Sequence, residues 1–483
     1  MHIKMIQQII GLLLMLFSTS MLPPIVMDLF FSEDALNSFL LSYVILIITG
    51  LLFWYPVRKN KKELKIRDGF VVVVMFWSVL GISGALPFIF YQPLQISMTD
   101  AVFESVSALT TTGATVITSL DTLPHALLFY RQQLQWMGGM GIIVLAVAIL
   151  PMLGIGGMQL YRAETPGPVK DSKLTPRITE TAKALWYIYL WLTISCALAY
   201  WAAGMNWFDA IGHSFSTVAI GGFSTHDASL GYFDSPLIEA VAIVFMFLGG
   251  INFALHFLAF KRRSFIPFLA DAEFKTYALV LLLSVVIAVL FLFFSQTVDT
   301  FSVAFRQGVF QAVSIGTTTG FTTTGYFLWP VFLPVFLLFI SFIGGCSGST
   351  GGGMKVIRVL LLFKQGAREL VKLVHPNAQV VVKIGKQPMS DRVIDAVWGF
   401  FAAYVALFVL MMLLLMMAGN DQVTAFSAVA ATMNNLGPGL GEVGANYSSI
   451  NDFSKWVLCF AMLLGRLEVF TLLVLFTPVF WRR

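Results

Sequence analysis

Four short polar stretches, each containing a glycine, interrupt an otherwise apolar sequence. Aligned without gaps, they read SVSALTTTGAT (105–115), SFSTVAIGGFS (214–224), AVSIGTTTGFT (312–322) and VAATMNNLGPG (429–439). The ninth position of every stretch is a glycine: Gly113, Gly222, Gly320 and Gly437. Glycine permits a positive φ and so frees the direction of backbone carbonyls, while threonine adds a hydroxyl oxygen. Rings of such oxygens can replace the hydration shell of a cation, so the pattern indicates an ion-coordinating site.

The composition predicts a membrane protein built of helices. The chain has 483 residues, of which 58% are hydrophobic and 11% charged, with a mean hydropathy of +0.84. Soluble proteins have roughly 25% charged residues. Apolar runs of about 20 residues recur along the chain, and each can cross a hydrocarbon layer about 30 Å thick. The N-terminal run is read as a first membrane helix, because no small-residue cleavage site follows it.

Positive charge is clustered at regular intervals. Lys and Arg gather near positions 60, 170, 268 and 375 and at the C-terminal WRR, and long K/R-free regions separate the clusters. Cytoplasmic loops carry an excess of Lys and Arg. The clusters are therefore expected inside, with both chain termini cytoplasmic and two spans before residue 58. The three cysteines lie far apart in apolar stretches, so no disulfide framework or metal-ligand spacing is predicted.

Between successive basic clusters the same unit occurs four times: an apolar run, one of the polar stretches, and a second apolar run. The paired runs are roughly 69–95 and 125–157, 182–204 and 235–260, 276–296 and 328–362, and 392–418 and 453–479. Each polar stretch continues a helix too short to span, such as DAVFESVSAL (100–109). Non-helical backbone at membrane depth must be buried in protein or line water. The repeats therefore predict an all-α integral membrane fold, with two N-terminal helices and four pseudo-fourfold helix–pore loop–helix units around one central pore.

The predicted segments follow from these runs: 1–67 with two transmembrane helices, then pore repeats at 68–160, 161–260, 261–365 and 366–483. The alternative interpretation is that the polar stretches are re-entrant turns that merely pack between helices. Four stretches in register, each between two spans, favour the pore.

A run of small residues, GGCSGSTGGG (344–353), lies halfway along the second apolar run of repeat three. Each interior glycine costs a helix about 1 kcal/mol against alanine, so a regular helix is not expected there. The alternative is a glycine-rich face for close helix packing. Because the small residues are consecutive rather than at helical spacing, an intramembrane loop is favoured.

One arginine lies in the middle of the last apolar run. A charge at mid-membrane costs at least about 2.5 kcal/mol, so Arg466 should meet a partner or water. The carbonyls of the glycine-rich loop are the expected partners, which would let Arg466 hold that loop closed. The alternative is a structural ion pair with Glu468 or another helix. Lys355, directly after the glycines, is a second candidate for this role or an anchor at the cytoplasmic edge.

The polar stretches resemble the potassium-channel filter, whose consensus is T-V-G-Y-G. TTG at 111–113 and 318–320 keeps the Thr-x-Gly core, whereas IGG at 220–222 and NLG at 435–437 keep only the last glycine. Longer stretches, including GHSFSTVAIGGFSTHDAS, FIGGCSGSTGGGMKVIR and NNLGPGLGEV, resemble the TrkH branch of the TrkH/KtrB superfamily of K⁺ transporters. The resemblance covers essentially the whole chain.

The resemblance implies K⁺ uptake across the bacterial inner membrane, with K⁺ as the transported ion and no bound organic cofactor. It assigns K⁺ coordination to Thr111, Thr112, Gly113, Ile220, Gly221, Gly222, Thr318, Thr319, Gly320, Asn435, Leu436 and Gly437. It assigns gating to Gly345, Cys346, Ser347, Gly348, Ser349, Thr350, Gly351, Gly352 and Gly353, with Lys355 and Arg466. Two quarters depart from Thr-x-Gly, so strict K⁺ over Na⁺ selectivity is less assured.

The resemblance also implies partners. These are a second copy in a homodimer, membrane lipid, and a cytoplasmic nucleotide-binding subunit of the TrkA type, with no nucleic acid. The TrkA-type subunit is expected to contact the basic segments 160–183, 261–275 and 358–392. The sequence itself has no phosphate-binding G-x-x-x-x-G-K motif, so nucleotide control would come from another chain.

Two other functions are compatible with parts of the sequence. A K⁺/H⁺ or K⁺/Na⁺ symporter stays open, although carriers often use inverted repeats and these repeats all run in one direction. An intramembrane serine protease would use GCSG (345–348) with His256, but that motif is short and leaves the four stretches unexplained. A transport protein rather than an enzyme is therefore expected.

Several polar residues outside the filter received simpler interpretations. Three acidic residues near the outer ends of the pore segments would enrich cations at the mouth or cap helices: Asp100, Glu104 and Glu442. Arg131 and Arg306 are interpreted as structural residues, and His213 and His226 as hydrogen-bonding residues, with a role in proton coupling as the alternative.

Overall fold

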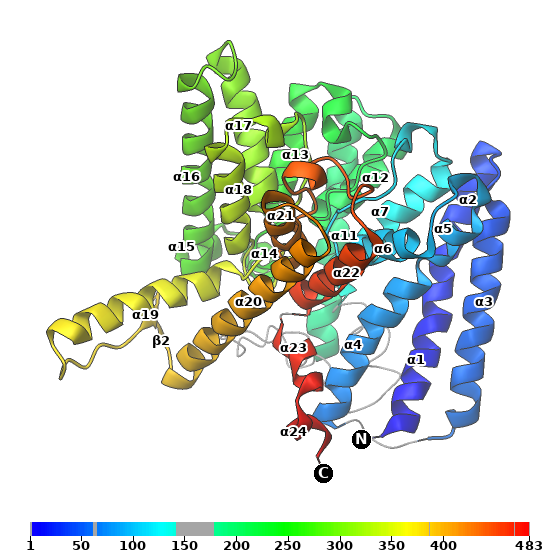
Figure 1. Cartoon of the computed structure of the whole chain (residues 1–483), viewed down its shortest axis with the longest axis horizontal. Helices are drawn as coiled ribbons and strands as arrows, with labels where there is room; N and C mark the ends of the chain where they lie inside the picture. The colour runs from blue at the N-terminus through cyan, green and yellow to red at the C-terminus, as the bar shows by residue number, and fades with distance from the viewer. Residues whose placement is uncertain (1, 61–64, 142–177, 386, 468, 483) are drawn as a thin grey trace.

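The computed structural model describes residues 2–60, 65–141, 178–385, 387–467 and 469–482. These residues are almost entirely helical (Figure 1). The strands among them form one hairpin of two short strands, β1 (Lys383–Ile384) and β2 (Gln387–Pro388). Six of the described helices are long and apolar enough to cross a membrane, or up to eight if each of two bent helix pairs counts as one crossing. The all-α membrane fold is confirmed.

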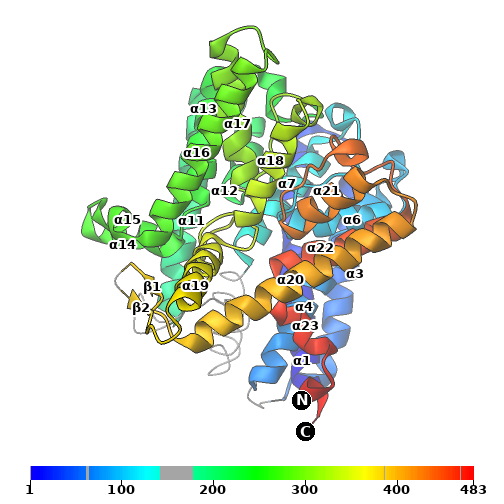
Figure 2. The same ribbon diagram turned by 60° about the vertical axis from the view of Figure 1, so that its left-hand side comes forward.

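Two helical spans precede the repeats, as predicted. The first runs through α1 (Ile3–Ser18), η1 (Thr19–Met21) and α2 (Leu22–Phe31), and the second through α3 (Leu36–Trp54) and η2 (Tyr55–Val57). The helices α1 and α3 lie side by side in both views (Figures 1 and 2). A Cβ on Gly11 would lie 2.7 Å from the carbonyl oxygen of Gly50, so the absence of side chains here lets the two backbones touch.

The four repeats share one order of helices. Each begins with a long outer helix: α4 (Ile66–Ser83), α11 (Ile178–Ala202), α16 (Ala272–Phe294) and α20 (Asp391–Met417). A short buried helix follows: α6 (Met98–Leu109), α12 (Trp207–Val218), α17 (Phe301–Gly316) and α21 (Gln422–Met433). An inner helix comes last: α7 (His125–Gly139), α13 (Pro236–Gly249), α18 (Phe332–Ile343) and α22 (Asp452–Arg466).

Each short helix starts at a residue that favours helix starts. The side chains of four N-cap residues accept hydrogen bonds from amides of the first turn: Ser97, Asn206, Thr300 and Asp421. Such caps satisfy amides that have no partner inside the helix. The starts of the short helices are thus encoded locally, which fixes where each polar stretch begins.

The inner helices are shorter than the apolar runs that contain them. Helices α13 and α14 (Phe253–Arg262) meet at a 96° bend, and α22 turns by 109° into α23 (Phe470–Leu473) and η10 (Val474–Phe476). The glycine-rich segment separates α18 from α19 (Val356–Val374), as predicted. The sequence did not predict the breaks in repeats two and four. The end of the first inner run, 140–157, lies mostly outside the described residues.

The described part of the chain also has smaller elements: α5 (Leu86–Phe90), η3 (Gln92–Leu94), η4 (Leu120–Thr122), η7 (Ser229–Phe233), α15 (Ile266–Ala270), η8 (Tyr326–Leu328), η9 (Gly441–Val443) and α24 (Pro478–Trp481). Both ends of the chain lie at one end of the molecule (Figures 1 and 2). Helices α14, α15 and α19 and the β-hairpin project together on one side (Figure 2).

Polar contacts join every pair of neighbouring repeats. The contacts are Arg131 to the Ser224 carbonyl (repeats one and two), Arg306 to Glu239 (two and three), the Tyr326 hydroxyl to the Gly439 carbonyl (three and four), and Lys455 to Asp100 (four and one). The repeats therefore form a closed assembly.

Candidate ion-coordinating site

The four polar stretches leave their short helices by the same turn. In every repeat the seventh position has a positive φ between 51° and 69°, namely Thr111, Ile220, Thr318 and Asn435. The amide after it donates to the carbonyl five residues earlier: Thr112 to Ser107, Gly221 to Ser216, Thr319 to Ser314, and Leu436 to Ala431, at 2.7–2.9 Å. This is the Schellman helix ending, which usually has glycine at the left-handed position. Three of the four residues here are β-branched, so the backbone is strained.

The four glycines close a ring. A Cβ on Gly113 would overlap the Gly221 carbonyl. A Cβ on each of the other three glycines would likewise meet a carbonyl: Gly222 that of Thr319, Gly320 that of Leu436, and Gly437 that of Thr112. Each glycine thus lies against a carbonyl at the preceding position of the next repeat, and the fourth repeat returns to the first. The predicted residues are therefore brought together at one place on a common axis.

The ring is not symmetric in its side chains. Repeats one and three carry paired hydroxyls, with Thr110 to Thr112 at 2.8 Å and Thr317 to Thr319 at 2.7 Å. In repeat four, the Asn435 amide donates to the Thr112 hydroxyl at 2.9 Å. This asymmetry follows the sequence differences among the quarters.

Sequence reasoning missed two side chains that touch the ring. Buried Gln135 on α7 donates to the Gly221 carbonyl at 2.6 Å and accepts from the Phe223 amide at 3.0 Å. The Tyr447 hydroxyl donates to the Gly437 carbonyl at 2.7 Å. These contacts support the two quarters that lack Thr-x-Gly. The glutamines of YRQQLQW, inside an apolar run, were the available signal for Gln135.

A buried ion pair lies behind the first quarter. Arg131 and Glu104 are both fully buried and lie 2.7 Å apart, and the Glu104 carboxylate also accepts from the Val116 amide at 2.9 Å. Arg131 further donates to the Ser224 carbonyl of repeat two at 3.2 Å. The expectation that Glu104 faces cations at the mouth is wrong, because the side chain is enclosed.

Two other outer residues also have structural partners. Asp100 forms an ion pair with Lys455 at 2.6 Å, while Arg306 forms a bidentate pair with Glu239 at 2.9 Å. The structural interpretation of Arg306 agrees with this contact. Glu442 is exposed and is not an N-cap residue. Its amide donates to the Thr424 hydroxyl.

The glycine-rich segment (344–353) forms direct hydrogen bonds with polar stretches of three repeats. The Thr350 hydroxyl donates to the Val218 carbonyl of repeat two at 2.8 Å, and the Gly352 amide donates to the Thr318 hydroxyl of repeat three at 2.7 Å. The Gly353 amide donates to the Asn434 carbonyl of repeat four at 3.0 Å. The loop therefore sits directly next to the ring.

Arg466 connects this loop to the remaining repeat. Its guanidinium donates to the Thr350 carbonyl at 3.4 Å, to the Thr111 hydroxyl at 3.3 Å, and to the Gly138 carbonyl on α7. It also lies over the Trp77 ring, 5.2 Å from the centroid. Lys355 donates to the Gly351 carbonyl within the loop. The alternative pair with Glu468 lies outside the described residues.

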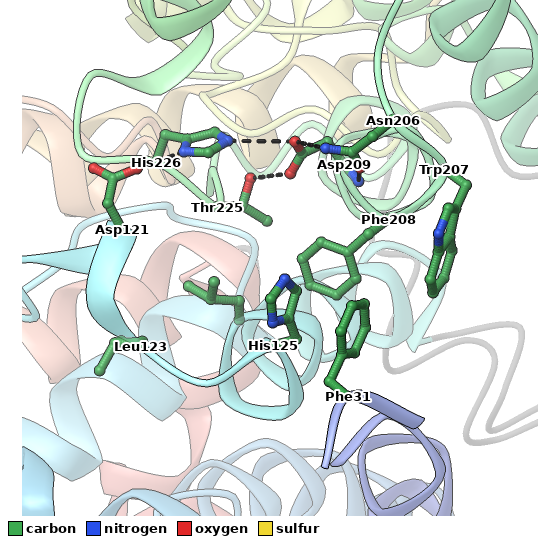
Figure 3. A pocket seen from close by; sticks show the side chains of 11 residues that line it. Phe31, Asp121, Leu123, His125, Asn206, Trp207, Phe208, Asp209, Thr225 and His226 are labelled. Carbon is green, nitrogen blue, oxygen red and sulfur yellow. Dashed lines mark hydrogen bonds and ion pairs between the residues drawn. The ribbon is translucent and has the colours of Figure 1, made fainter. Parts of the chain in front are cut away.

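A cavity of about 250 Å³ lies where repeats one and two meet (Figure 3). On one side, His226 stands between two carboxylates, 2.5 Å from Asp121 and 3.3 Å from Asp209. The His226 amide donates to the Ser224 hydroxyl, which also lies 2.9 Å from the His213 ring. The carboxylates thus clamp the non-helical segment that continues from the second quarter.

The contacts in this clamp shift the pKa values of His226 and Asp209. Burial disfavours the imidazolium of His226, but hydrogen bonds and attraction from Asp209 and Asp121 outweigh it, so the pKa of His226 is raised. Burial alone would raise the pKa of Asp209, yet hydrogen bonds from His226 and Thr225 lower it. The contacts between the two groups therefore favour the charged form of each.

The architecture defines the class: an integral membrane protein whose four repeats bring oxygen-bearing stretches to one axis. A family model described as a cation transport protein, TrkH, matches residues 35–482. The chain belongs to the TrkH family.

Named relatives match over the full length of both chains. The chain is 60% identical to the Trk system potassium uptake protein TrkH of Vibrio parahaemolyticus serotype O3:K6 (strain RIMD 2210633), and 56% identical to that of Escherichia coli (strain K12). The crystal structure of the potassium transporter TrkH from Vibrio parahaemolyticus superposes with a TM-score of 0.91 over all of both chains, at 56% identity. These relatives are transporters, so the chain is a transport protein rather than an enzyme, and the protease interpretation is set aside.

The clamp predicts a pH-dependent stability. A group whose pKa is raised on folding stabilises fully below its ordinary pKa, about 6.5 for histidine, and loses this contribution as pH rises through the raised value. Wild type should therefore unfold at a higher temperature than His226→Gln at about pH 5.5, with a difference that shrinks towards about pH 9.

Thermal unfolding in detergent across this pH range measures the difference. The exposed His375 gives a matched control, because His375→Gln removes a histidine outside the clamp. A constant separation between wild type and His226→Gln at every pH would contradict the coupling.

Proposed function

We propose that this protein takes up K⁺ across the bacterial inner membrane through a central pore, with the four polar stretches as its selectivity filter. The observation that carries the proposal is the closed ring of contacts between each glycine and the next repeat's carbonyl. The relatives named as potassium uptake proteins, at up to 60% identity over the whole chain, support K⁺ as the ion.

The filter works through backbone oxygens. Within each quarter a positive φ at the seventh position is followed by a positive φ at the ninth, as at Thr111 (56°) and Gly113 (80°). This alternation turns successive carbonyls toward one side, where their oxygens replace the water around the ion. Side chains that already donate to the Gly221 and Gly437 carbonyls weaken those two ligands, so K⁺ over Na⁺ selectivity is less strict than in a fourfold-identical filter.

The loop at 344–353 acts as the gate. It lies next to the filter and is hydrogen-bonded to repeats two, three and four, and Arg466 extends the contact to repeat one. A loop held at all four sides of one axis obstructs that axis, and the arginine adds a positive charge that repels cations. Opening requires these contacts to break together. Lys355 assists from the end of the loop through the Gly351 carbonyl.

Regulation comes from a cytoplasmic TrkA-type nucleotide-binding subunit, and the transporter itself is a homodimer. The name "Trk system" of the relatives implies several components. Basic segments at 261–275 and 358–392 belong to the projecting helices α14, α15 and α19 and the hairpin (Figure 2), which offer a joint surface. Most of the third expected contact, 160–183, lies outside the described residues. Both termini lie at one end, in line with a cytoplasmic location for both.

The direct test is ion uptake by the purified protein in liposomes. Rb⁺, as a K⁺ analogue, should enter at least several-fold faster than Na⁺, and an imposed pH gradient without a voltage should not drive it. Rb⁺ uptake driven by the pH gradient would instead establish the K⁺/H⁺ symporter, and dependence on external Na⁺ would establish the K⁺/Na⁺ symporter. Absence of Rb⁺ flux under every gradient would contradict the proposal.

The filter predicts a specific glycine effect. Gly113→Ser should reduce K⁺ uptake at least about tenfold, because Gly113 has φ 80° and its Cβ would displace the Gly221 carbonyl. Gly419→Ser is the matched control: Gly419 has φ 97°, but a Cβ there meets nothing within 4 Å. Uptake at equal membrane abundance is the measurement, and similar losses in both variants would argue against a filter at Gly113.

The gate predicts an opposite effect. Arg466→Ala should raise basal flux about tenfold, because hydrogen bonds from a charged donor to Thr350, Thr111 and Gly138 are lost. Arg466→Lys keeps the charge without the planar donor fork and should fall between the two. Arg306→Gln, which breaks an ion pair at the outer rim, serves as control. Unchanged or lower flux in Arg466→Ala at equal abundance would favour a purely structural arginine.

A further inference from the structure

Glu273 is a buried carboxylate that no part of the filter explains. It lies in the first turn of α16, the outer helix of repeat three, and only 8% of it is exposed. Its Oε1 accepts from the Ser347 amide at 2.7 Å and from the Ile357 amide at 3.2 Å. Ser347 belongs to the glycine-rich loop, and Ile357 lies in the first turn of α19.

The Glu273 Oε1 atom therefore joins the start of the loop to the helix that follows it. The two amides it accepts from lie on either side of the segment that reaches the ring, Gly348–Gly353, so they cannot separate while both bonds are kept. Ile357 supplies one of the helix-start amides that have no partner within α19, so the Glu273 oxygen satisfies a donor that would otherwise be unpaired.

The composition of the loop gives it few side chains with which to hold its own position. Five of its residues from Gly345 onward are glycines, which contribute no side chains to fix their position. Two of its other hydrogen bonds, from the Thr350 hydroxyl to the Val218 carbonyl and from the Gly352 amide to the Thr318 hydroxyl, end on a short helix and a filter stretch. Glu273 differs because α16 contributes nothing to the ring.

We propose that Glu273 is the positioning residue that latches the glycine-rich loop in its place beside the filter. This inference rests on the proposed gate. When the two amide bonds to Glu273 break, the loop can swing away from the ring while the ring itself stays intact. Glu273 therefore sets how often the pore opens, and does so without touching an ion.

A cysteine in the loop can report whether the loop has left its place. Cys346, next to Ser347, is fully buried, and its amide donates to the Gly250 carbonyl at 2.9 Å. The other two cysteines of the chain, Cys196 and Cys459, are also buried and can be replaced by alanine. Release of the loop would expose the Cys346 thiol, so its reaction with a membrane-permeant maleimide measures the latch independently of ion flux.

The experiment compares three variants of the full chain, each with Cys346 as the one cysteine left, in liposomes. Glu273→Ala removes the acceptor and should raise the labelling rate of Cys346 about tenfold. Glu273→Gln keeps an acceptor oxygen and should return labelling to within about threefold of the parent. Asp271→Asn is the matched control, because Asp271 lies at the same helix start but accepts from the Phe274 amide.

Rb⁺ flux is measured on the same samples and should rise in the order of the labelling rates. Parental labelling in Glu273→Ala would overturn the latch. Faster labelling with unchanged flux would support the latch and overturn the gate. A second background that keeps only Cys459 tests for general loosening: if Glu273→Ala speeds labelling there equally, the carboxylate stabilises the fold as a whole, and the latch is overturned.

Discussion

The contact on which this architecture depends is the approach of each filter glycine to a carbonyl of the next repeat. Such an approach needs a residue without a Cβ and with a positive φ, and glycine alone satisfies both without strain. Four contacts in sequence, from Gly113 to Gly437 and back to Thr112, tie segments more than 300 residues apart into one ring. The left-handed Thr, Ile and Asn residues beside them carry strain of about 1–3 kcal/mol each. Buried short helices with well-formed caps, and polar contacts at all four repeat junctions, hold this strain in place.

A second layer of close approaches lies behind the ring. A Cβ on Gly138 of α7 would overlap the Leu109 carbonyl at the end of α6, and Gly465 of α22 has the same relation to Met433 at the end of α21. Gly249 of α13 lies near the Val218 carbonyl in repeat two. Repeat three differs, because there the loop residue Gly351 approaches the Thr317 carbonyl. The loop thus occupies the place that an inner helix takes elsewhere, which explains why α18 stops at Ile343.

The sequence predicted those features that are encoded locally and repeated. The glycine register and the short helices follow from nearby residue types, and four copies reinforce one another. The break at 344–353 occurs once, but its consecutive small residues are a strong local signal. The bends after α13 and α22 were not predicted, since LGGINF and GRLEVF lie inside long apolar runs and hydropathy does not register a change of direction. Gln135, Tyr447 and Glu273 were missed for another reason. Each acts on backbone groups 10 to 88 residues away, and only the fold brings the partners together.

A single chain with unequal repeats can do what four identical subunits cannot. Symmetry would place four copies of any loop on the axis, where they would exclude one another, whereas here one repeat supplies the loop and another supplies Arg466. The partners of that arginine, Thr350, Thr111 and Gly138, belong to repeats three and one, so one side chain couples the loop to the filter across the axis. A carboxylate on α16 anchors the opposite end of the same loop. The loss of fourfold symmetry in the sequence is therefore the physical condition for the proposed gate, in which one carboxylate and one arginine hold a single loop.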